Sequence, residues 1–281
     1  MKQAQESPDR YCVFGNPIEH SRSPQIHHAF AEQTEQNIQY TRELVDLDGF
    51  AERAKKFFDD GGIGANVTVP FKQDAYDFAN VLTDRAKAAG AVNTLARVDE
   101  GQIVGDNTDG IGMVRDITHR LQWSLEGKRI LILGAGGAVR GVLLPLLQEK
   151  PQSVAIANRT KSKAEDLSAL FGEYGDLKGY SFNTLPNEPF DLIINGTSAG
   201  FSGDVPPVHF GCFAPDTAVY DMMYADEPTE FLRFAADMGV SKLSDGLGML
   251  VAQGAESFRL WRGVEPQTHP VITLLSQNKR V

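Results

Sequence analysis

The stretch KRILILGAGGAVRG, residues 128–141, constrains the fold of this chain more than any other. Its unbroken apolar run, residues 130–133, predicts a buried parallel strand. A cluster of glycines follows, and then a helical pattern of apolar residues over 138–147. A strand, a glycine turn and a helix in this order favour a phosphate-binding site at the first N–H groups of the helix. A plain glycine-rich turn of an α/β protein is the alternative that this pattern leaves open.

The glycine turn departs from the spacing G-x-G-x-x-G, because Val139 stands where the last glycine would be. We expect a diphosphate to approach the backbone at Gly134, Gly136 and Gly137, where a side chain would collide with it. We expect the small Ala138, rather than Val139, to make the close contact between helix and sheet.

The 281 residues are enough for two modest domains, and the pattern of elements changes near Asp109. We expect an α/β protein in which residues 1–109 form a substrate-binding and catalytic domain with a mainly parallel sheet. Residues 110–247 are predicted as a Rossmann-type dinucleotide-binding domain, since strands and helices alternate there. The apolar helical pattern that begins at residue 248 predicts a C-terminal segment, 248–281, that returns to the first domain.

Hydrophobic periodicity and turn residues predict the individual elements. In the first domain, strands are expected at 11–15, 38–44 and 61–69, a hairpin at 91–98 and 102–105, and helices at 25–34, from Asp48 as N-cap to 59, from Pro70 onward, and at 83–89. In the second, strands are expected at 130–133, 153–157, 190–195 and 218–221, helices at 111–121, 138–147, 161–171 and 248–261, and an irregular loop at 202–215.

Composition excludes several classes of partner. The net charge of -10 disfavours nucleic acid, and no apolar run reaches the roughly 20 residues of a membrane span. The six histidines and the two cysteines, Cys12 and Cys212, lack the spacing of a metal site, so no metal is expected. Free thiols and a start without an apolar core favour a cytoplasmic protein.

The segment NRTKSK, residues 158–163, follows the second predicted strand of the nucleotide domain. An Asp or Glu that binds the ribose 2′-hydroxyl of NAD is expected at this place, and none is present. Arg159 offers a fork of donors for a 2′-phosphate, Lys161 and Lys163 add positive charge, and Asn158 and Thr160 can donate neutral hydrogen bonds. The segment therefore favours NADP over NAD, with a solvated charge cluster as the alternative.

Reduction of a ketone by hydride needs an acid that protonates the oxygen, and Lys72 in NVTVPFK is the best candidate in the first domain. Asp109 in GDNTDG can hold its ammonium group in place. An ordinary surface lysine is the competing interpretation of Lys72.

Small polar residues near strand ends suit a hydroxylated substrate. Ser21 and Ser23 offer two hydroxyls to a carboxylate or a polyol, or they cap the helix after them. Asn66, Thr68 and Asn93 are neutral and fit hydroxyl groups better than an apolar or highly charged ligand, unless they only satisfy turns.

As ordered strings over nearly the whole chain, GNPIEHSRSPQIHHAF, NVTVPFK, GAVNT, GDNTDG, GAGGAVRG, ANRT, INGTSAG, YDMMY and DGLGMLVAQGAESF resemble the shikimate dehydrogenase family. The resemblance implies NADP-dependent, reversible reduction of 3-dehydroshikimate to shikimate, with Lys72 and Asp109 as the catalytic pair. It implies substrate contacts at Ser21, Ser23, Asn66, Thr68, Asn93, Tyr224 and Gln253. It implies cofactor contacts at Gly134, Ala135, Gly136, Gly137, Ala138, Asn158, Arg159, Thr160, Lys163, Thr197, Met222 and Gly246, and also at Asp84.

The sequence departs from the family pattern at two places. Lys163 stands where many members carry a second arginine, so a point charge replaces a fork on the 2′-phosphate. Gly196 stands where alanine is commoner, which we expect to matter little. A quinate/shikimate dehydrogenase that uses both NAD and NADP, and a non-catalytic NADPH-binding sensor, remain as alternatives. We expect an enzyme that acts on a small molecule and that is a monomer or a homodimer.

Overall fold

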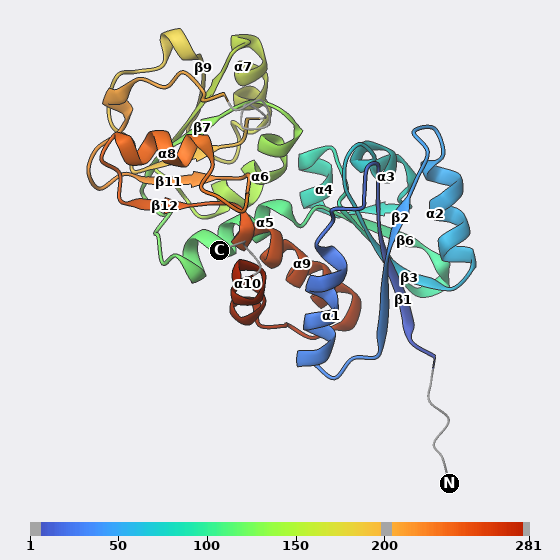
Figure 1. Ribbon diagram of the computed structural model, residues 1–281. Helices are drawn as coiled ribbons and strands as arrows, with labels where there is room; N and C mark the ends of the chain where they lie inside the picture. The colour runs from blue at the N-terminus through green and yellow to red at the C-terminus, as the bar shows by residue number, and fades with distance from the viewer. Residues whose placement is uncertain (1–6, 198–203, 278–281) are drawn as a thin grey trace. The chain divides into compact units, whose positions relative to one another are not determined.

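The computed structural model describes residues 7–197 and 204–277. The chain forms two compact units, of which unit 1 contains residues 1–108 and 253–271, and unit 2 contains residues 109–252 and 272–281 (Figure 1). Whereas the sequence assigns all of 248–281 to the first domain, helix α9 (Leu247–Arg262) begins in unit 2 and continues in unit 1. Across both described ranges, no helix combines the length and the apolar character that a bilayer span requires.

Unit 1 is built on a six-stranded sheet of order β2-β1-β3-β5-β6-β4. The strands are β1 (Asp9–Gly15), β2 (Ile38–Leu44), β3 (Gly62–Val67), β4 (Val81–Leu82), β5 (Thr94–Arg97) and β6 (Ile103–Asp106). Strands β1, β2 and β3 are parallel, and β5 and β6 form an antiparallel hairpin. The predicted hairpin is confirmed, and its turn contains Glu100 and Gly101 with positive φ.

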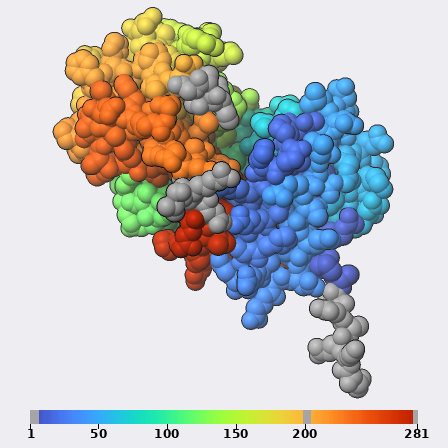
Figure 2. Space-filling view, viewed as in Figure 1, coloured from blue at the N-terminus to red at the C-terminus, as the bar shows by residue number. Residues whose placement is uncertain are grey.

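Alternate residues of β1 pack on helices that cover opposite faces of this sheet. Helix α2 (Phe50–Asp59) covers one face, where the Phe14 ring meets that of Phe50 at 5.7 Å. Tyr11 points to the other face, where its ring lies 4.9 Å from that of Trp261 in α9, and α1 (Ser23–Gln33) packs on the same side (Figure 1). The charged residues of α2 are exposed or half-buried, and Figure 2 shows the blue segment of the chain that includes this helix at the surface.

Two predicted helix starts in unit 1 are wrong. Helix α2 begins at Phe50 with Gly49 as N-cap, and Asp48 makes no cap. Helix α3 (Lys72–Phe78) begins two residues after Pro70, because the Phe71 N–H first closes a turn by donating to the Thr68 carbonyl at 3.0 Å. Helix α4 (Asp84–Ala89) begins as predicted and is capped by Thr83, whose hydroxyl accepts a hydrogen bond from the Ala86 N–H.

Unit 2 has a fully parallel sheet of order β12-β11-β10-β7-β8-β9, which confirms the predicted Rossmann-type architecture. Its strands are β7 (Arg129–Leu133), β8 (Ser153–Asn158), β9 (Leu177–Ser181), β10 (Leu192–Asn195), β11 (Ala218–Asp221) and β12 (Lys242–Ser244). The sequence does not predict the two outer strands, β9 and β12. Both are short and contain lysine or glycine, so neither shows a clear apolar period.

The helices of unit 2 cover both faces of its sheet. They include α5 (Asp109–Arg115), α6 (Gly137–Gln148), α7 (Lys161–Leu170) and α8 (Glu230–Asp237). The first part of α9 also belongs to unit 2, whereas α10 (Thr268–Gln277) begins in unit 1 and ends in unit 2. A single π-helical turn, Asp116–Arg120, continues α5. Helices α5 and α6 approach closely, since a Cβ on Gly110 would lie 2.7 Å from the Gly141 carbonyl oxygen. Helix α8 packs against Leu131 and Leu133 on the other face.

Candidate functional site

The glycine turn between β7 and α6 has the backbone geometry of an open phosphate cradle. Gly134 has φ of +102°, and a Cβ there would lie 3.1 Å from the Gly196 carbonyl oxygen, so a side chain is excluded twice. Gly136 and Gly137 are exposed, and no atom lies within 4 Å of a Cβ built on either. Helix α6 begins here without a side-chain cap, which leaves its first N–H groups available to an anion.

The predicted contact of Ala138 with the sheet is wrong. Ala138 is exposed, whereas Val139 is fully buried. The space for Val139 comes from the partner strand, because a Cβ on Gly196 would lie 2.5 Å from Val139 Cγ2 and 3.0 Å from Met222 Sδ. Gly196 and Val139, the two departures from the usual motifs, therefore fit each other, so the structure leads us to expect that glycine at 196 matters after all.

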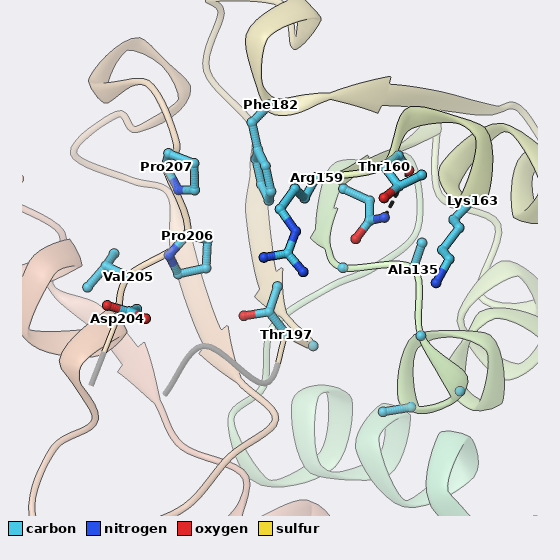
Figure 3. A pocket seen from close by; sticks show the side chains of 16 residues that line it. Ala135, Arg159, Thr160, Lys163, Phe182, Thr197, Asp204, Val205, Pro206 and Pro207 are labelled. Atoms are coloured by element: carbon cyan, nitrogen blue, oxygen red, sulfur yellow. Dashed lines mark hydrogen bonds between the residues drawn. The ribbon is translucent and has the colours of Figure 1, made fainter. Parts of the chain in front are cut away.

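A cavity of about 620 Å³ opens in unit 2 over this turn (Figure 3). Its volume is in the range of small-molecule and cofactor sites. It is lined by most of the residues predicted to contact the cofactor: Gly134, Ala135, Gly136, Gly137, Ala138, Asn158, Arg159, Thr160, Lys163 and Thr197. The glycine turn and the end of β8 thus belong to one site, as their sequence predicts.

Positive charge lies on one side of this cavity. Arg159 directly follows β8, and its guanidinium group points into the cavity, while Lys163 extends from α7 toward the glycine turn (Figure 3). Lys161 does not line the cavity and instead pairs with Glu165 at 2.7 Å. Strand β8 ends in Asn158, whose amide donates to the Thr160 carbonyl at 2.9 Å, so the acidic residue of NAD sites is replaced by neutral and cationic groups.

The opposite side of the cavity is mainly apolar, and the sequence did not lead us to predict the residues that line it. Val205, Pro206 and Pro207 line it together with Asp204, and the Phe182 ring lies between this segment and Arg159 in the view of Figure 3. Phe182 directly follows β9. Because that strand was not predicted, the position of Phe182 at the cavity was not predicted either. The segment 204–207 lay inside a predicted loop whose first two residues fall outside the described part of the chain. An apolar wall facing a cation suits the flat base and charged phosphate of a nucleotide.

Thr197 is held at the cavity by a chain of buried polar groups. Its N–H and its hydroxyl both donate to Asn195 Oδ1, at 3.1 and 2.8 Å, and the Asn195 amide donates to Asp221 at 3.1 Å. Asp221 also accepts from the Thr229 hydroxyl at 2.6 Å. Burial raises the pKa of Asp221, although its hydrogen bonds oppose this.

The other predicted cofactor residues do not line the cavity. Met222 and Gly246 contact each other, because Gly246 donates its N–H to the Met223 carbonyl and a Cβ on Gly246 would collide with the Met222 carbonyl. Asp84 lies in unit 1, at the first residue of α4, where its exposed carboxylate meets Lys87 at 3.4 Å. The predicted substrate residue Tyr224 is half-buried and follows β11 in unit 2.

Lys72 is the first residue of α3, and its side chain is half-buried. Its carbonyl accepts a hydrogen bond from the Val92 N–H at 2.9 Å, which fixes the start of α3 beside the segment that carries Asn93. Asp109 follows Thr108 directly and is the first residue of α5 in unit 2. The structure thus gives both predicted catalytic groups a defined backbone position at the start of a helix.

Ser21 and Ser23 form a hydroxyl pair where the loop passes into α1, of which Ser23 is the first residue. Ser21 Oγ donates to Ser23 Oγ at 3.2 Å and accepts from the Ser23 N–H at 3.3 Å. The N-cap residue of α1 is Arg22, which makes no side-chain cap. Arg42 holds the loop by donating twice to the Ser21 carbonyl, at 2.9 and 2.6 Å.

Asn93 directly precedes β5 and bonds to Thr108 and to Gln253 in the first half of α9. Its Oδ1 accepts from the Thr108 N–H at 2.8 Å, and its amide donates to Gln253 Oε1 at 3.3 Å and to the Thr108 hydroxyl at 3.0 Å. Thr68 is half-buried beside Gly15, where a Cβ would lie 2.6 Å from Thr68 Cγ2. Asn66, Thr68, Asn93 and Gln253 are therefore all residues of unit 1.

Asn66 is the predicted substrate residue on β3 and is buried, with 5% of its surface exposed. Its Oδ1 accepts hydrogen bonds from the Tyr40 hydroxyl at 2.7 Å and from His27 Nε2 at 3.1 Å. Its amide nitrogen lies within hydrogen-bonding distance of three oxygens, those of the Asn93 carbonyl and of the Thr94 and Ser257 hydroxyls. No cluster of three or more His, Cys, Asp or Glu side chains suited to a metal ion occurs within the described ranges.

Known proteins match this architecture from end to end. Three family profiles match the chain: "Shikimate dehydrogenase substrate binding domain" over residues 13–95, "Shikimate / quinate 5-dehydrogenase" over 116–200, and "Shikimate 5'-dehydrogenase C-terminal domain" over 246–275. The shikimate dehydrogenase (NADP(+)) of Cellvibrio japonicus is 55% identical, over 95% of this chain and 96% of that protein. The enzyme of the same name from Vibrio campbellii is 53% identical, over 96% and 97%.

The chain belongs to the shikimate dehydrogenase family.

Solved structures with the shikimate dehydrogenase fold agree with this assignment. The Ael1 enzyme from Pseudomonas putida is 41% identical, with a TM-score of 0.91 over 95% of this chain and 98% of that one. Shikimate 5-dehydrogenase from Thermus thermophilus, solved with NADP(H) and shikimate, is 31% identical, with a TM-score of 0.83 over 97% and 100%. The 5-ketofructose reductase of a Gluconobacter strain is 30% identical, with a TM-score of 0.85 over 97% and 99%.

Proposed function

We propose that this protein is an NADP-dependent shikimate dehydrogenase, which reversibly reduces 3-dehydroshikimate to shikimate. The observation that carries the proposal is the cavity of unit 2, where a glycine cradle meets Arg159 and Lys163 and no acidic residue follows β8. Relatives named shikimate dehydrogenase (NADP(+)) at 50–55% identity over nearly the whole chain support the substrate and the cofactor. The reaction belongs to the biosynthesis of aromatic amino acids.

The residues of the cavity fit NADP in three respects. Gly136 and Gly137 present bare backbone to the diphosphate at the N-terminus of α6. Arg159 and Lys163 supply two cations for the 2′-phosphate. Phe182 and Pro206 provide an apolar wall, and Thr197, Met222 and Gly246 complete the proposed contacts on the other side of β10. When bound, NADPH supplies the hydride that reduces the ketone.

Lys72 is the proposed proton donor. In the reducing direction, hydride is added to the 3-keto carbon, and the Lys72 ammonium group gives its proton to the ketone oxygen, which becomes the hydroxyl of shikimate. Asp109 is its proposed partner, because a carboxylate holds the ammonium group and stabilises its charge. In the oxidising direction the neutral lysine accepts the proton of the same hydroxyl.

The substrate is proposed to bind in unit 1. Ser21 and Ser23 are a hydroxyl pair suited to the carboxylate. Thr68, Asn93 and Gln253 offer neutral donors and acceptors for the ring hydroxyls. Tyr224 is the proposed contribution of unit 2, and the part played by Asn66 is argued below. Asp84 is retained as a proposed cofactor contact on the family resemblance alone.

The direct test is the appearance of NADPH absorbance at 340 nm when the purified protein receives shikimate and NADP⁺. We expect turnover with shikimate and NADP⁺, and a lower kcat/KM with quinate or with NAD⁺, because Arg159 and Lys163 favour the 2′-phosphate. Comparable kcat/KM for quinate and NAD⁺ would instead indicate a quinate/shikimate dehydrogenase. NADPH binding without any turnover would indicate a sensor.

We further propose a cytoplasmic monomer or homodimer. The two cysteines, Cys12 and Cys212, are both buried free thiols, which suits a reducing compartment. Sedimentation equilibrium of the full chain distinguishes the two assemblies, and fractionation of the native cells locates the protein.

A further inference from the structure

Tyr40, a residue to which neither the motifs nor the comparisons give a role, bonds directly to one of the proposed substrate residues. It lies in β2 with 3% of its surface exposed, so it is enclosed by protein. Its hydroxyl donates to Asn66 Oδ1 at 2.7 Å. The phenol of β2 is therefore joined to the asparagine of β3.

The amide orientation of Asn66 is fixed by the backbone. Its Nδ2 faces the Asn93 carbonyl at 3.2 Å, and a carbonyl can only accept, so the other end of the amide must be the oxygen. That oxygen receives the Tyr40 hydroxyl and the His27 Nε2–H. Both lone pairs of Oδ1 are then used, and the two hydrogens of Nδ2 share three acceptors.

Asn66 thus has no hydrogen-bonding capacity left for a ligand, although the family resemblance implies a substrate contact. What its amide does is hold other groups. The Ser257 hydroxyl, which accepts from Nδ2 at 3.0 Å, lies 2.8 Å from the Thr94 hydroxyl, and Thr94 donates to Asn93 Oδ1 at 2.9 Å. The chain of bonds therefore runs from Tyr40 to Asn93.

His27 completes the clamp on Asn66 from an aromatic environment. Its ring stacks on Tyr40 with centroids 4.4 Å apart and a 6° angle between the planes. Among the described residues, none hydrogen-bonds its Nδ1. A buried nitrogen without a partner is costly, so a phenylalanine would suit the stack better. Retention of histidine is explained by the hydrogen that Nε2 gives to Asn66.

We propose that Tyr40 is a positioning residue: through Asn66 it sets the orientation of the hydroxyl and amide groups that bind the substrate, without touching the substrate itself. This rests on the proposed function. Loss of the Tyr40 hydroxyl leaves the Asn66 amide less constrained, and the hydrogen bonds from Asn66 to Asn93 carry this change to shikimate binding. The side chain of Tyr40 bonds Asn66, and its N–H donates to His28, both of them in unit 1 and remote in sequence from the cofactor cavity.

The test compares Tyr40→Phe with Tyr11→Phe. Tyr11 is the register partner of Tyr40 on the neighbouring strand β1 and is equally buried, but its hydroxyl accepts from Arg262 outside this network. For Tyr40→Phe we expect KM for shikimate to rise roughly three- to tenfold, the effect of one lost hydrogen bond. KM for NADP⁺ should stay unchanged. Tyr11→Phe should leave both values as in the wild type.

Ser257→Ala is the second variant, because Ser257 is fully buried in α9 and is not among the proposed substrate contacts. It removes one of the three acceptors of Asn66 Nδ2 and the partner of the Thr94 hydroxyl, and should raise KM for shikimate in the same direction. The proposal is overturned if KM for shikimate stays within twofold of the wild type in both Tyr40→Phe and Ser257→Ala. It is also overturned if Tyr11→Phe raises KM equally, since any buried hydroxyl would then do so.

The outcome separates this proposal from the proposed function. A wild-type protein that reduces NADP⁺ with shikimate, together with unaffected variants, overturns the positioning role alone. A wild-type protein that neither turns over shikimate nor shows a shift in thermal melting with it overturns both. Thermal melting of each variant without ligand shows whether it is folded, and the two Tyr→Phe variants, which lose the same group from the same sheet, are compared directly.

Discussion

The two units present their proposed ligand groups in opposite ways. In unit 2 the cavity is formed by bare backbone at Gly134, Gly136 and Gly137 and by the exposed cations Arg159 and Lys163. In unit 1 the polar groups are bonded to one another, mostly in the interior, from Tyr40 to Gln253. The arrangement in unit 2 depends on glycines, which have no side chain to block the backbone. The arrangement in unit 1 depends on hydrogen bonds between side chains.

This difference matches the chemistry of the two ligands. A diphosphate is strongly charged, and helix N–H groups or flexible cations can bind it without exact placement. A sugar-like ring offers several neutral hydroxyls, and discrimination among them needs donors and acceptors held in fixed directions. The substrate unit therefore needs a supporting network, whereas the cofactor unit needs mainly empty space beside a helix start.

The largest effect is expected for Lys72→Ala, which separates chemistry from binding within unit 1. Loss of a positioned proton donor costs about 10²- to 10⁴-fold in rate. We therefore expect kcat to fall by about that factor with little change in KM for shikimate, opposite to the network variants. Steady-state kinetics at saturating NADP⁺ measure both values. A Lys72→Ala protein that keeps near-normal kcat would show that Lys72 is not the proton donor.

The features of unit 2 were largely predictable from the sequence, because they are local. The turn at Gly134 to Ala138 lies between a buried strand and an amphipathic helix that follow each other directly, and NRTKSK lies at the end of the next strand. The contact of Val139 with the sheet was predicted wrongly, because the spacing of the glycine motif describes only the turn and its helix. The space for its side chain comes from Gly196, which follows a different strand.

The supporting network of unit 1 was not predictable in the same way. Tyr40 alternates like any residue of a half-buried strand, and Ser257 is one polar residue in an apolar helix. Their common partner is Asn66, and Ser257 is separated from it by 191 positions in the sequence. The individual substrate residues came from the family motifs, whereas the bonds that connect them required the packing of α1 and α9 on the sheet.

An intermediate effect, on the unfolding free energy, is expected for substitutions at Gly196. One substitution should disrupt its packing against Val139, and a second should restore it. Gly196→Ala places a methyl group 2.5 Å from Val139 Cγ2 and 3.0 Å from Met222 Sδ. Such overpacking typically costs about 1–3 kcal/mol of unfolding free energy. Val139→Ala in the same chain should recover most of this loss, because it removes the methyl groups that collide.

Urea unfolding of the two single variants and the double variant measures this coupling. Gly137→Ala is the matched control, since no atom lies within 4 Å of a Cβ at that position. It should leave the unfolding free energy nearly unchanged while raising KM for NADP⁺, because the methyl group meets the diphosphate rather than the protein. Additive losses in the Gly196→Ala/Val139→Ala protein would contradict the proposed fit.

The smallest effect is expected from His27 in the network of unit 1, where each unit of pH changes the unfolding free energy only slightly. Burial lowers the pKa of His27 to about 3, from an ordinary value near 6.5, although its bond to Asn66 opposes this. The unfolded chain then binds the proton more readily than the folded chain between these two values. Stability therefore falls as pH falls through this window, by about 2 kcal/mol between pH 7 and pH 5 for this one group.

Replacement of the His27 ring by one that cannot titrate isolates this contribution. His27→Phe should remove that part of the loss, as measured by urea unfolding at both pH values. His209→Gln, which changes an exposed histidine, should keep the full wild-type slope. An unchanged slope in His27→Phe would mean that His27 is protonated in the folded protein, and a protonated ring would donate from both nitrogens and could not leave Nδ1 without a partner.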